Sequence, residues 1–185
     1  KEMSRAGEGS SAGARNVEAL ARVLRYRALA AVAIEQGIAF IATAHQLEDQ
    51  AETVLMNLLR GASLTGIGGI ATSRVLPASL RPAGAAPGAS PRLLRPLIAA
   101  GVDRAGCEAI CRAAGFECAN DATNQHTARF RNAVRHELLP VIRRLRPAGV
   151  MAIARAADSA REAESVVDRR IRAVFRASQV RHAAG

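Results

Sequence analysis

Residues 38–43 (IAFIAT) form a short apolar run that ends in polar residues and then in a helical pattern, and this order limits the fold more than any other feature. Gly37 precedes the run, and His45 and Gln46 follow it. A short continuous apolar run is typical of a strand that is buried on both faces in a parallel sheet. We therefore expect an α/β fold in which polar residues lie at the carboxyl end of the strand, where open α/β sheets bind ligands.

Helical patterns surround this strand. Before it, Asn16 can act as an N-cap, and apolar spacings of three and four predict a helix that ends near Gly37 and packs through Val17, Leu20, Leu24, Ala28 and Ala31. After it, a helix over 47–60 should end at Gly61 and pack through Leu47, Ala51, Val54, Leu55 and Leu58. Later helices are predicted over 103–114, over 129–139 before Pro140, and over 148–178, the last with an apolar stripe at Ile153, Ala157, Ala160, Val167, Ile171 and Val174.

The domain organisation follows from these patterns. Residues 1–15 are small and polar, so we expect a disordered or cut start; residues 16–124 should form the α/β domain, and residues 125–185 a basic helical region. Thirteen of the fifteen residues over 77–91 are Pro, Ala, Gly or Ser, which predicts a mobile insert. The glycines over 66–69 follow a helix and are interpreted as a turn.

Charge separates the last third of the chain from the rest. The formal net charge is +10, and residues 125–185 contain thirteen basic and five acidic side chains. Arginine pairs with phosphate through two parallel hydrogen bonds, which favours a polyanionic partner, although a high-GC genome gives the same arginine bias. No apolar run approaches the roughly 20 residues that cross a bilayer, which excludes an integral membrane protein.

The polar cluster after the strand carries the candidate chemistry. Asp49 and Glu52 are three residues apart on the predicted helix, and Glu48 and Glu52 are four apart, so carboxylates share one helix face. Such a pair can hold Mg²⁺, and a histidine at the strand end can meet a phosphate or a reacting base. From spacing alone, an equally good interpretation is an ordinary solvated helix N-terminus, in which the acids complement the helix dipole.

The same segment resembles the HxxxDxxET region of the PP-loop ATP pyrophosphatases that modify tRNA, and most closely that of the tRNA(Ile)-lysidine synthase family. Three further pieces resemble that family in the expected order: ARVLRY (21–26), LRPL (94–97), and DATN through RNAVR and Pro140 (121–140). Together the pieces cover roughly residues 16–146. The resemblance implies a PP-loop domain with a partial parallel sheet.

The resemblance also implies an activity, which is ATP-dependent ligation of lysine to the anticodon cytidine of an isoleucine tRNA with a CAU anticodon. The cytidine is adenylated with loss of pyrophosphate, and the lysine amine then displaces AMP. On this reading His45, Asp49 and Glu52 are catalytic, with Mg²⁺ at Asp49. The expected substrate-binding residues are Arg22, Asp121 and Asn124, and the expected tRNA-binding residues are Arg129, Arg131, Asn132, Arg135, Arg143 and Arg144.

One family element is missing from the sequence. The SGGxDS loop that binds ATP phosphates occurs nowhere in the 185 residues, and the chain begins at Lys1. We therefore expect that the chain lacks an amino-terminal portion and that by itself it does not release AMP. The resemblance allows a homodimer, but intramolecular packing explains the apolar stripes equally well.

Two other functions stay open. A noncatalytic tRNA-binding or RNA-binding module would keep the basic helices without the ATP loop. A tRNA cytidine thiolation enzyme fits less well, because Cys107, Cys111 and Cys118 lack paired CxxC spacing, and the first two are predicted to be buried with Ile110 and Ala114 on one helix stripe. The few cysteines and the absence of a signal peptide predict a cytoplasmic location.

Overall fold

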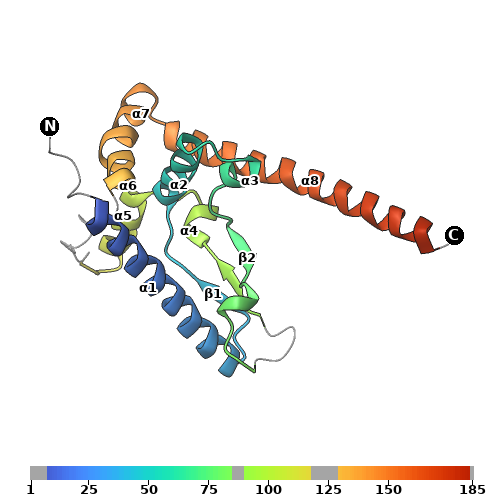
Figure 1. Cartoon of the computed structure of the whole chain (residues 1–185). Helices are drawn as coiled ribbons and strands as arrows, with labels where there is room; N and C mark the ends of the chain where they lie inside the picture. Colours follow the sequence, from blue (N-terminus) through green and yellow to red (C-terminus); the bar gives the residue numbers. More distant parts are fainter. Residues whose placement is uncertain (1–7, 85–89, 118–128, 184–185) are drawn as a thin grey trace, which may run out of the picture.

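The computed structural model describes residues 8–84, 90–117 and 129–183. Its sheet has three short strands, β1 (Phe40–Ala42), β2 (Ser73–Val75) and β3 (Arg92–Leu94), in the order β1-β3-β2 (Figure 1). β1 runs parallel to β3, and β2 runs antiparallel to it. The α/β fold with a partly parallel sheet and a helical carboxyl-terminal region is therefore confirmed.

Helix α1 (Glu8–Glu35) covers one face of this sheet. Tyr26, Ala30 and Ala33 pack against Ile41 and Leu93, and the same core holds Leu76, with half-buried Leu80 beside it. Two alanines on the packing face let the helix approach the strands closely. This first core fixes where β1 and β3 end, and therefore where the polar turn after β1 begins.

The predicted packing stripe of this helix was wrong. Val17, Leu20 and Leu24 are more than half exposed, Ala28 is exposed and Ala31 is half-buried; the helix also begins eight residues before Asn16. A helix of 28 residues is about 42 Å long, whereas a strand of three residues spans only about 10 Å. The sheet can therefore cover only the last turns of α1, and periodicity does not show which turns those are.

The prediction that β1 is buried on both faces was also wrong. Ile41 is buried against α1, but Phe40 is 56% exposed and Ala42 is exposed. Side chains alternate between the faces of a strand, so Phe40 points away from α1. Within the described residues, no helix buries that second face.

A second core joins the helical region to α2 (Leu47–Leu59). Leu47 and Ala51 of α2 pack with Leu139, Val150 and Ala154, which come from the helices after residue 129. Two short helices, α3 (Leu64–Ile67) and α4 (Pro96–Ala99), and the helix α5 (Arg104–Ala113) complete the part before residue 118, and Asp103 caps α5 through Gly106 N. The helices predicted over 47–60 and 103–114 are confirmed.

The helix predicted to stop before Pro140 continues through it. α6 (Arg129–Ala133), a π-helical turn η3 (Val134–Leu138) and α7 (Leu139–Leu145) follow one another without a break. Proline has no N–H to donate to the preceding turn, and the wider π turn, in which Leu139 N donates to Val134 O, takes up that irregularity.

Helix α8 (Gly149–Ala183) is longer than the predicted helix and extends beyond the body of the protein (Figure 1). Ala157 of its predicted stripe is buried, but Val167, Ile171 and Val174 are about half exposed. The stripe therefore packs only over the first turns of α8, where α2 and α3 lie against it.

The cysteine prediction was wrong in its degree of burial. Cys107 and Cys111 are free thiols of intermediate exposure, while Ile110 is 56% exposed and Ala114 is exposed. Helix α5 lies at the margin of the structure, so it has too little neighbouring surface to bury the whole stripe. Cys118 lies outside the described residues.

Two other expectations fall partly outside the described residues. Ala78–Leu80 forms a 3-10 helix and Leu80 packs on the first core, so this part of the expected insert is tied to the body. Residues 85–89 are outside the described part, where the predicted mobility stays a prediction. Residues 1–7 of the expected disordered or cut start and the predicted domain boundary at 124/125 are also outside it, whereas residues 8–15 of that start belong to α1.

The turn predicted over 66–69 was wrong in its first half, because Gly66 and Ile67 lie in α3; the turn at Gly68 and Gly69 gives a stability test. Gly69 has φ +61°, and a Cβ there would lie 2.8 Å from Gln50 Oε1 and 2.9 Å from Val54 Cγ2, both of which are fixed in the interior. Gly69→Ala should lower the free energy of unfolding by about 2–3 kcal/mol, because a left-handed backbone and a steric clash add together. Gly61, with φ +73° and open space around it, is the matched control: Gly61→Ala should cost only about 1 kcal/mol. Urea unfolding measures both; equal losses would contradict the packing around Gly69.

Candidate functional site

The turn between β1 and α2 places His45 at the carboxyl end of the parallel strands. Thr43 N donates to Leu94 O at 2.9 Å, which ties the end of β1 to β3. Thr43 Oγ1 lies 2.9 Å from His45 Nδ1 and 3.4 Å from Leu94 O. These contacts fix the imidazole through Nδ1 and leave Nε2 for a substrate, as no hydrogen bond of Nε2 is seen within the described residues.

His45 is held in its neutral form. Burial lowers its pKa below the ordinary 6.5, and the positive charges of Arg95, Arg22 and Arg131 lower it further, while Asp49 acts in the opposite direction. An imidazole with a lowered pKa is uncharged at neutral pH, so one ring nitrogen carries the N–H and the other can accept a hydrogen bond or a proton. The surrounding guanidinium groups make this place attractive to an anion, whose arrival would raise the pKa of His45 again.

This lowered pKa predicts how stability varies with pH. A histidine whose pKa is lower in the folded chain binds fewer protons there than in the unfolded chain, so the unfolding free energy rises with pH across the interval between the two values. The contribution of His45 should be complete above pH 6.5 and should fall as the pH drops below it. Urea unfolding of the natural chain and of His45→Gln between pH 7.5 and 5 measures the difference. An imidazole that titrates at or above 6.5 by NMR would contradict the predicted direction.

Arg95 is a buried cation that the sequence analysis did not select as a site residue. It directly follows β3, it is 2% exposed, and its guanidinium donates to Ala71 O. Its Nε has no hydrogen-bond partner among the described residues. The LRPL segment over 94–97 was the signal that could have identified it. Arg22 lies beside this group, with its guanidinium 5.5 Å from the centre of the Tyr26 ring.

Asp49 connects the His45 turn to the helical region. Its Oδ2 accepts a hydrogen bond from Gln46 N at 3.0 Å and so closes the first turn of α2. Its Oδ1 lies 3.1 Å from the Arg131 guanidinium and 3.5 Å from that of Arg135. One carboxylate therefore contacts both the residue after His45 and the arginines of α6 and η3.

Glu52 is fully buried against the same two arginines. Its Oε2 accepts from Arg131 Nε at 2.8 Å, and its Oε1 accepts from Arg135 Nε at 2.6 Å. Glu48, one turn earlier on α2, accepts from Arg143 at 2.5 Å and from the backbone N of Arg104 at 3.0 Å. The structure thus brings together predicted catalytic carboxylates and predicted tRNA-binding arginines, which the sequence analysis had kept apart.

This arrangement does not fit a metal ion at Asp49. Both oxygens of Asp49 and both oxygens of Glu52 already accept hydrogen bonds from nitrogen donors. Among the described residues, no group of three or more His, Cys, Asp and Glu side chains could hold a metal ion.

The other predicted site residues lie in different places. Asn132 is half-buried beside Arg131, Arg144 is exposed on α7, and Arg129 begins α6. Asp121 and Asn124 lie outside the described residues. Their predicted roles stay predictions.

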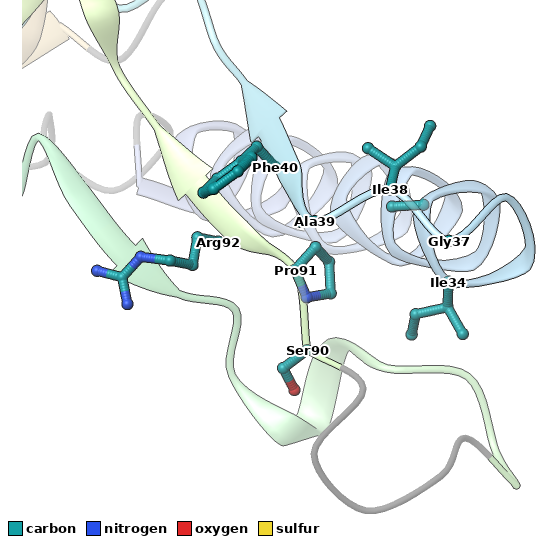
Figure 2. A pocket seen from close by; sticks show the side chains of 9 residues that line it. Ile34, Gly37, Ile38, Ala39, Phe40, Ser90, Pro91 and Arg92 are labelled. Atoms are coloured by element: carbon teal, nitrogen blue, oxygen red, sulfur yellow. The ribbon is translucent and has the colours of Figure 1, made fainter.

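An apolar pocket lies at the opposite, amino end of β1 and β3 (Figure 2). Its lining includes the apolar residues Ile34, Ile38, Phe40 and Pro91 and the polar residues Ser90 and Arg92. It contains no carboxylate and no histidine. Of the two ends of β1 and β3, the carboxyl end is therefore the one where the described histidine and carboxylates gather.

Comparison with known proteins agrees with this placement. The sequence model of the PP-loop domain matches residues 2–142, which include all three strands and the His45 turn. The chain belongs to the PP-loop domain family. The match ends within α7, so α6, η3 and most of α7 belong to the PP-loop region, while α8 follows it.

Several relatives of this PP-loop chain have the name tRNA(Ile)-lysidine synthase. The protein of Dehalococcoides mccartyi is 36% identical over 83% of the chain and 31% of its own length. The protein of Pseudomonas aeruginosa is 40% identical over 82% of the chain and 31% of its own length. The protein of Salinispora tropica is 43% identical over 76% of the chain and 38% of its own length. The chain thus spans about a third of the length of these relatives. No helix in the described ranges is long and apolar enough to cross a membrane.

Proposed function

We propose that this chain takes part in ATP-dependent ligation of lysine to the anticodon cytidine of an isoleucine tRNA. The observation that carries the proposal is a neutral histidine at the carboxyl end of the parallel strands, within reach of Arg22, Arg95 and Arg131, in a PP-loop domain. The reaction is proposed by analogy with its relatives, which have the name tRNA(Ile)-lysidine synthase.

The residues of the site suit the charges of that reaction. ATP, when bound, supplies the adenylyl group that activates the C2 oxygen of the cytidine, and the lysine amine then displaces AMP. Guanidinium groups near His45 stabilise the negative charge that gathers on the departing pyrophosphate. His45 Nε2 is the ring nitrogen available to exchange a proton with a reacting group.

Substrate and tRNA contacts follow from the exposed cations. Arg22 lies on α1 near His45 and would meet the carboxylate of lysine, with Asp121 and Asn124 as further predicted contacts. Arg144 is exposed on α7, and Arg146 is exposed at its end. Because no ion pair is seen for either within the described residues, these two arginines are the best candidates for contacts with tRNA phosphates. A cytoplasmic location and a homodimer stay predictions.

The second candidate is a noncatalytic tRNA-binding module. It is favoured by the exposed cations of α7. Both candidates predict tRNA binding that weakens with salt, and only the first predicts chemistry. Thiolation is weaker still, because the described cysteines lie on one helix at a spacing of four, without a CxxC pair.

The deciding experiment measures lysine-dependent release of AMP from ATP with isoleucine tRNA that has a CAU anticodon. The assay uses the complete natural polypeptide in which this sequence occurs, with the 185-residue chain alone beside it. We expect AMP release that requires both lysine and this tRNA and that falls at least a hundredfold in His45→Gln, within the range for loss of a general acid or base. Release without a need for lysine, or no release by a folded protein that binds tRNA, would defeat the ligase proposal, and the second of these results would favour the binding module.

A further inference from the structure

Arg131 and Arg135 share the same two carboxylates, those of Asp49 and Glu52, which sets them apart from the exposed arginines at the end of α7. Glu52 accepts from Arg131 Nε and from Arg135 Nε and NH2, at 2.8, 2.6 and 3.1 Å. Asp49 Oδ1 accepts from the NH2 groups of both arginines. The Arg131 and Arg135 side chains are only 28–29% exposed, and Glu52 is not exposed at all.

The charges in this group balance. Two guanidinium groups face two carboxylates, and the hydrogen bond to Glu52 is the main reason that the pKa of Arg135 is raised. Asp49 and Glu52 take the Nε and one terminal NH2 group of each guanidinium, and a tRNA phosphate that displaced them would leave Glu52 as a buried charge without its partners. The contacts of Arg131 and Arg135 are thus already made inside the protein.

These contacts fix α6 and η3 on α2. Arg131 lies on α6 and Arg135 on the π turn that follows, one helical turn away, and both reach the same face of α2. Arg143 on α7 adds a third tie, to Glu48. Glu48 also accepts from the first backbone N of α5, so the acidic face of α2 anchors the elements on both of its sides.

The anchor also reaches the candidate active site. Asp49 accepts from Gln46 N, in the residue directly after His45, while it contacts Arg131 and Arg135. A shift of α6 would therefore move Asp49 or change its charge environment, and would disturb the turn that carries His45. The exposed cations Arg144 and Arg146 are held at a set distance from that turn by the same contacts.

We infer that Arg131 and Arg135 are positioning residues: through Asp49 and Glu52 they set the placement of the basic helices relative to His45, and the phosphate contacts are made by Arg144 and Arg146. This inference rests on the proposed function for the identity of the partner, tRNA. It assigns to the arginine pair a role other than the direct tRNA contact that the sequence suggested.

The test compares Arg131→Gln and Arg135→Gln with the matched controls Arg144→Gln and Arg146→Gln in the 185-residue chain. The first readout is the slope of log affinity for isoleucine tRNA against log salt concentration. Loss of one phosphate contact reduces this slope by about 0.7–0.9. We expect that reduction for the two control variants and an unchanged slope for the positioning variants.

The second readout is amide hydrogen exchange over residues 129–145, which needs no tRNA. Faster exchange confined to this segment, with α2 and the sheet still protected, is expected for Arg131→Gln and Arg135→Gln but not for the controls. Because Arg135→Gln can weaken folding generally, Arg135→Lys serves as a second variant. Lysine keeps the charge but loses the bidentate contact, so this variant should also accelerate amide hydrogen exchange over residues 129–145. A contact with phosphate would instead tolerate lysine.

The two readouts separate the inference from the proposed function. A slope reduced by about 0.7–0.9 in Arg131→Gln or Arg135→Gln, with exchange unchanged, would overturn the positioning role. If the unaltered chain does not bind tRNA at all, the proposed partner fails, and the exchange measurement alone decides whether the arginines hold α6 on α2.

Discussion

Glu52→Ala is expected to lower the unfolding free energy of the chain by about 3 kcal/mol, because it leaves two guanidinium groups in a half-buried place with Asp49 as their remaining carboxylate. Removal of one partner from a buried ion pair costs about 3–5 kcal/mol, and we expect the lower end because Arg131 and Arg135 are partly exposed to water.

The measurement is the shift in urea midpoint at constant slope, with Glu35→Ala as the control. Glu35 is exposed at the end of α1, and its replacement should change stability by no more than about 0.5 kcal/mol. A loss below about 1 kcal/mol in Glu52→Ala would mean that Glu52 does not join α2 to the helical region.

Leu93→Ala should have an effect of similar size for a different reason. Leu93 is fully buried at the centre of the sheet, against Tyr26, Ala30 and Ile41. Its truncation removes buried methyl groups and leaves a cavity, which costs about 2–5 kcal/mol.

Phe40→Ala is the matched control for Leu93→Ala, because Phe40 is a large apolar residue of the neighbouring strand on the other face of the sheet. It is 56% exposed, so its loss should cost less than about 1 kcal/mol. Thermal or urea unfolding checks both variants. Similar losses would show that both faces of the sheet are buried, as the sequence suggested and the structure does not show.

Much of the fold could be predicted from local patterns. The strand over 38–43, the helix that Gly61 ends and the helix over 103–114 each depend on neighbouring residues, and each is found where the pattern places it. The face that a helix buries depends instead on what lies beside it. Periodicity therefore selected Val17, Leu20 and Leu24 on α1, although the short sheet contacts Tyr26, Ala30 and Ala33.

Sequence motifs selected the residues of the candidate site, but they did not indicate how those residues contact one another. His45, Asp49, Glu52, Arg131 and Arg135 were all selected from motifs, but acids on α2 were expected to face substrate, and the arginines were expected to face tRNA. Their pairing joins residues about 80 positions apart, and no local pattern contains such a distance. Arg95 was missed because a single arginine after a strand gives no sign of burial until the fold surrounds it.

The most direct test of this account is a double-mutant cycle between Glu52 and Arg135, with Glu52→Gln, Arg135→Gln and the double variant. The exposed pair Arg172 and Asp168 on α8, 3.2 Å apart, is the control and should show a coupling energy of no more than about 0.5 kcal/mol. The account predicts a stabilising coupling of about 2 kcal/mol or more between Glu52 and Arg135 in urea unfolding. A coupling as small as that of the control pair would contradict the claim that the acidic face of α2 holds the basic helices beside His45.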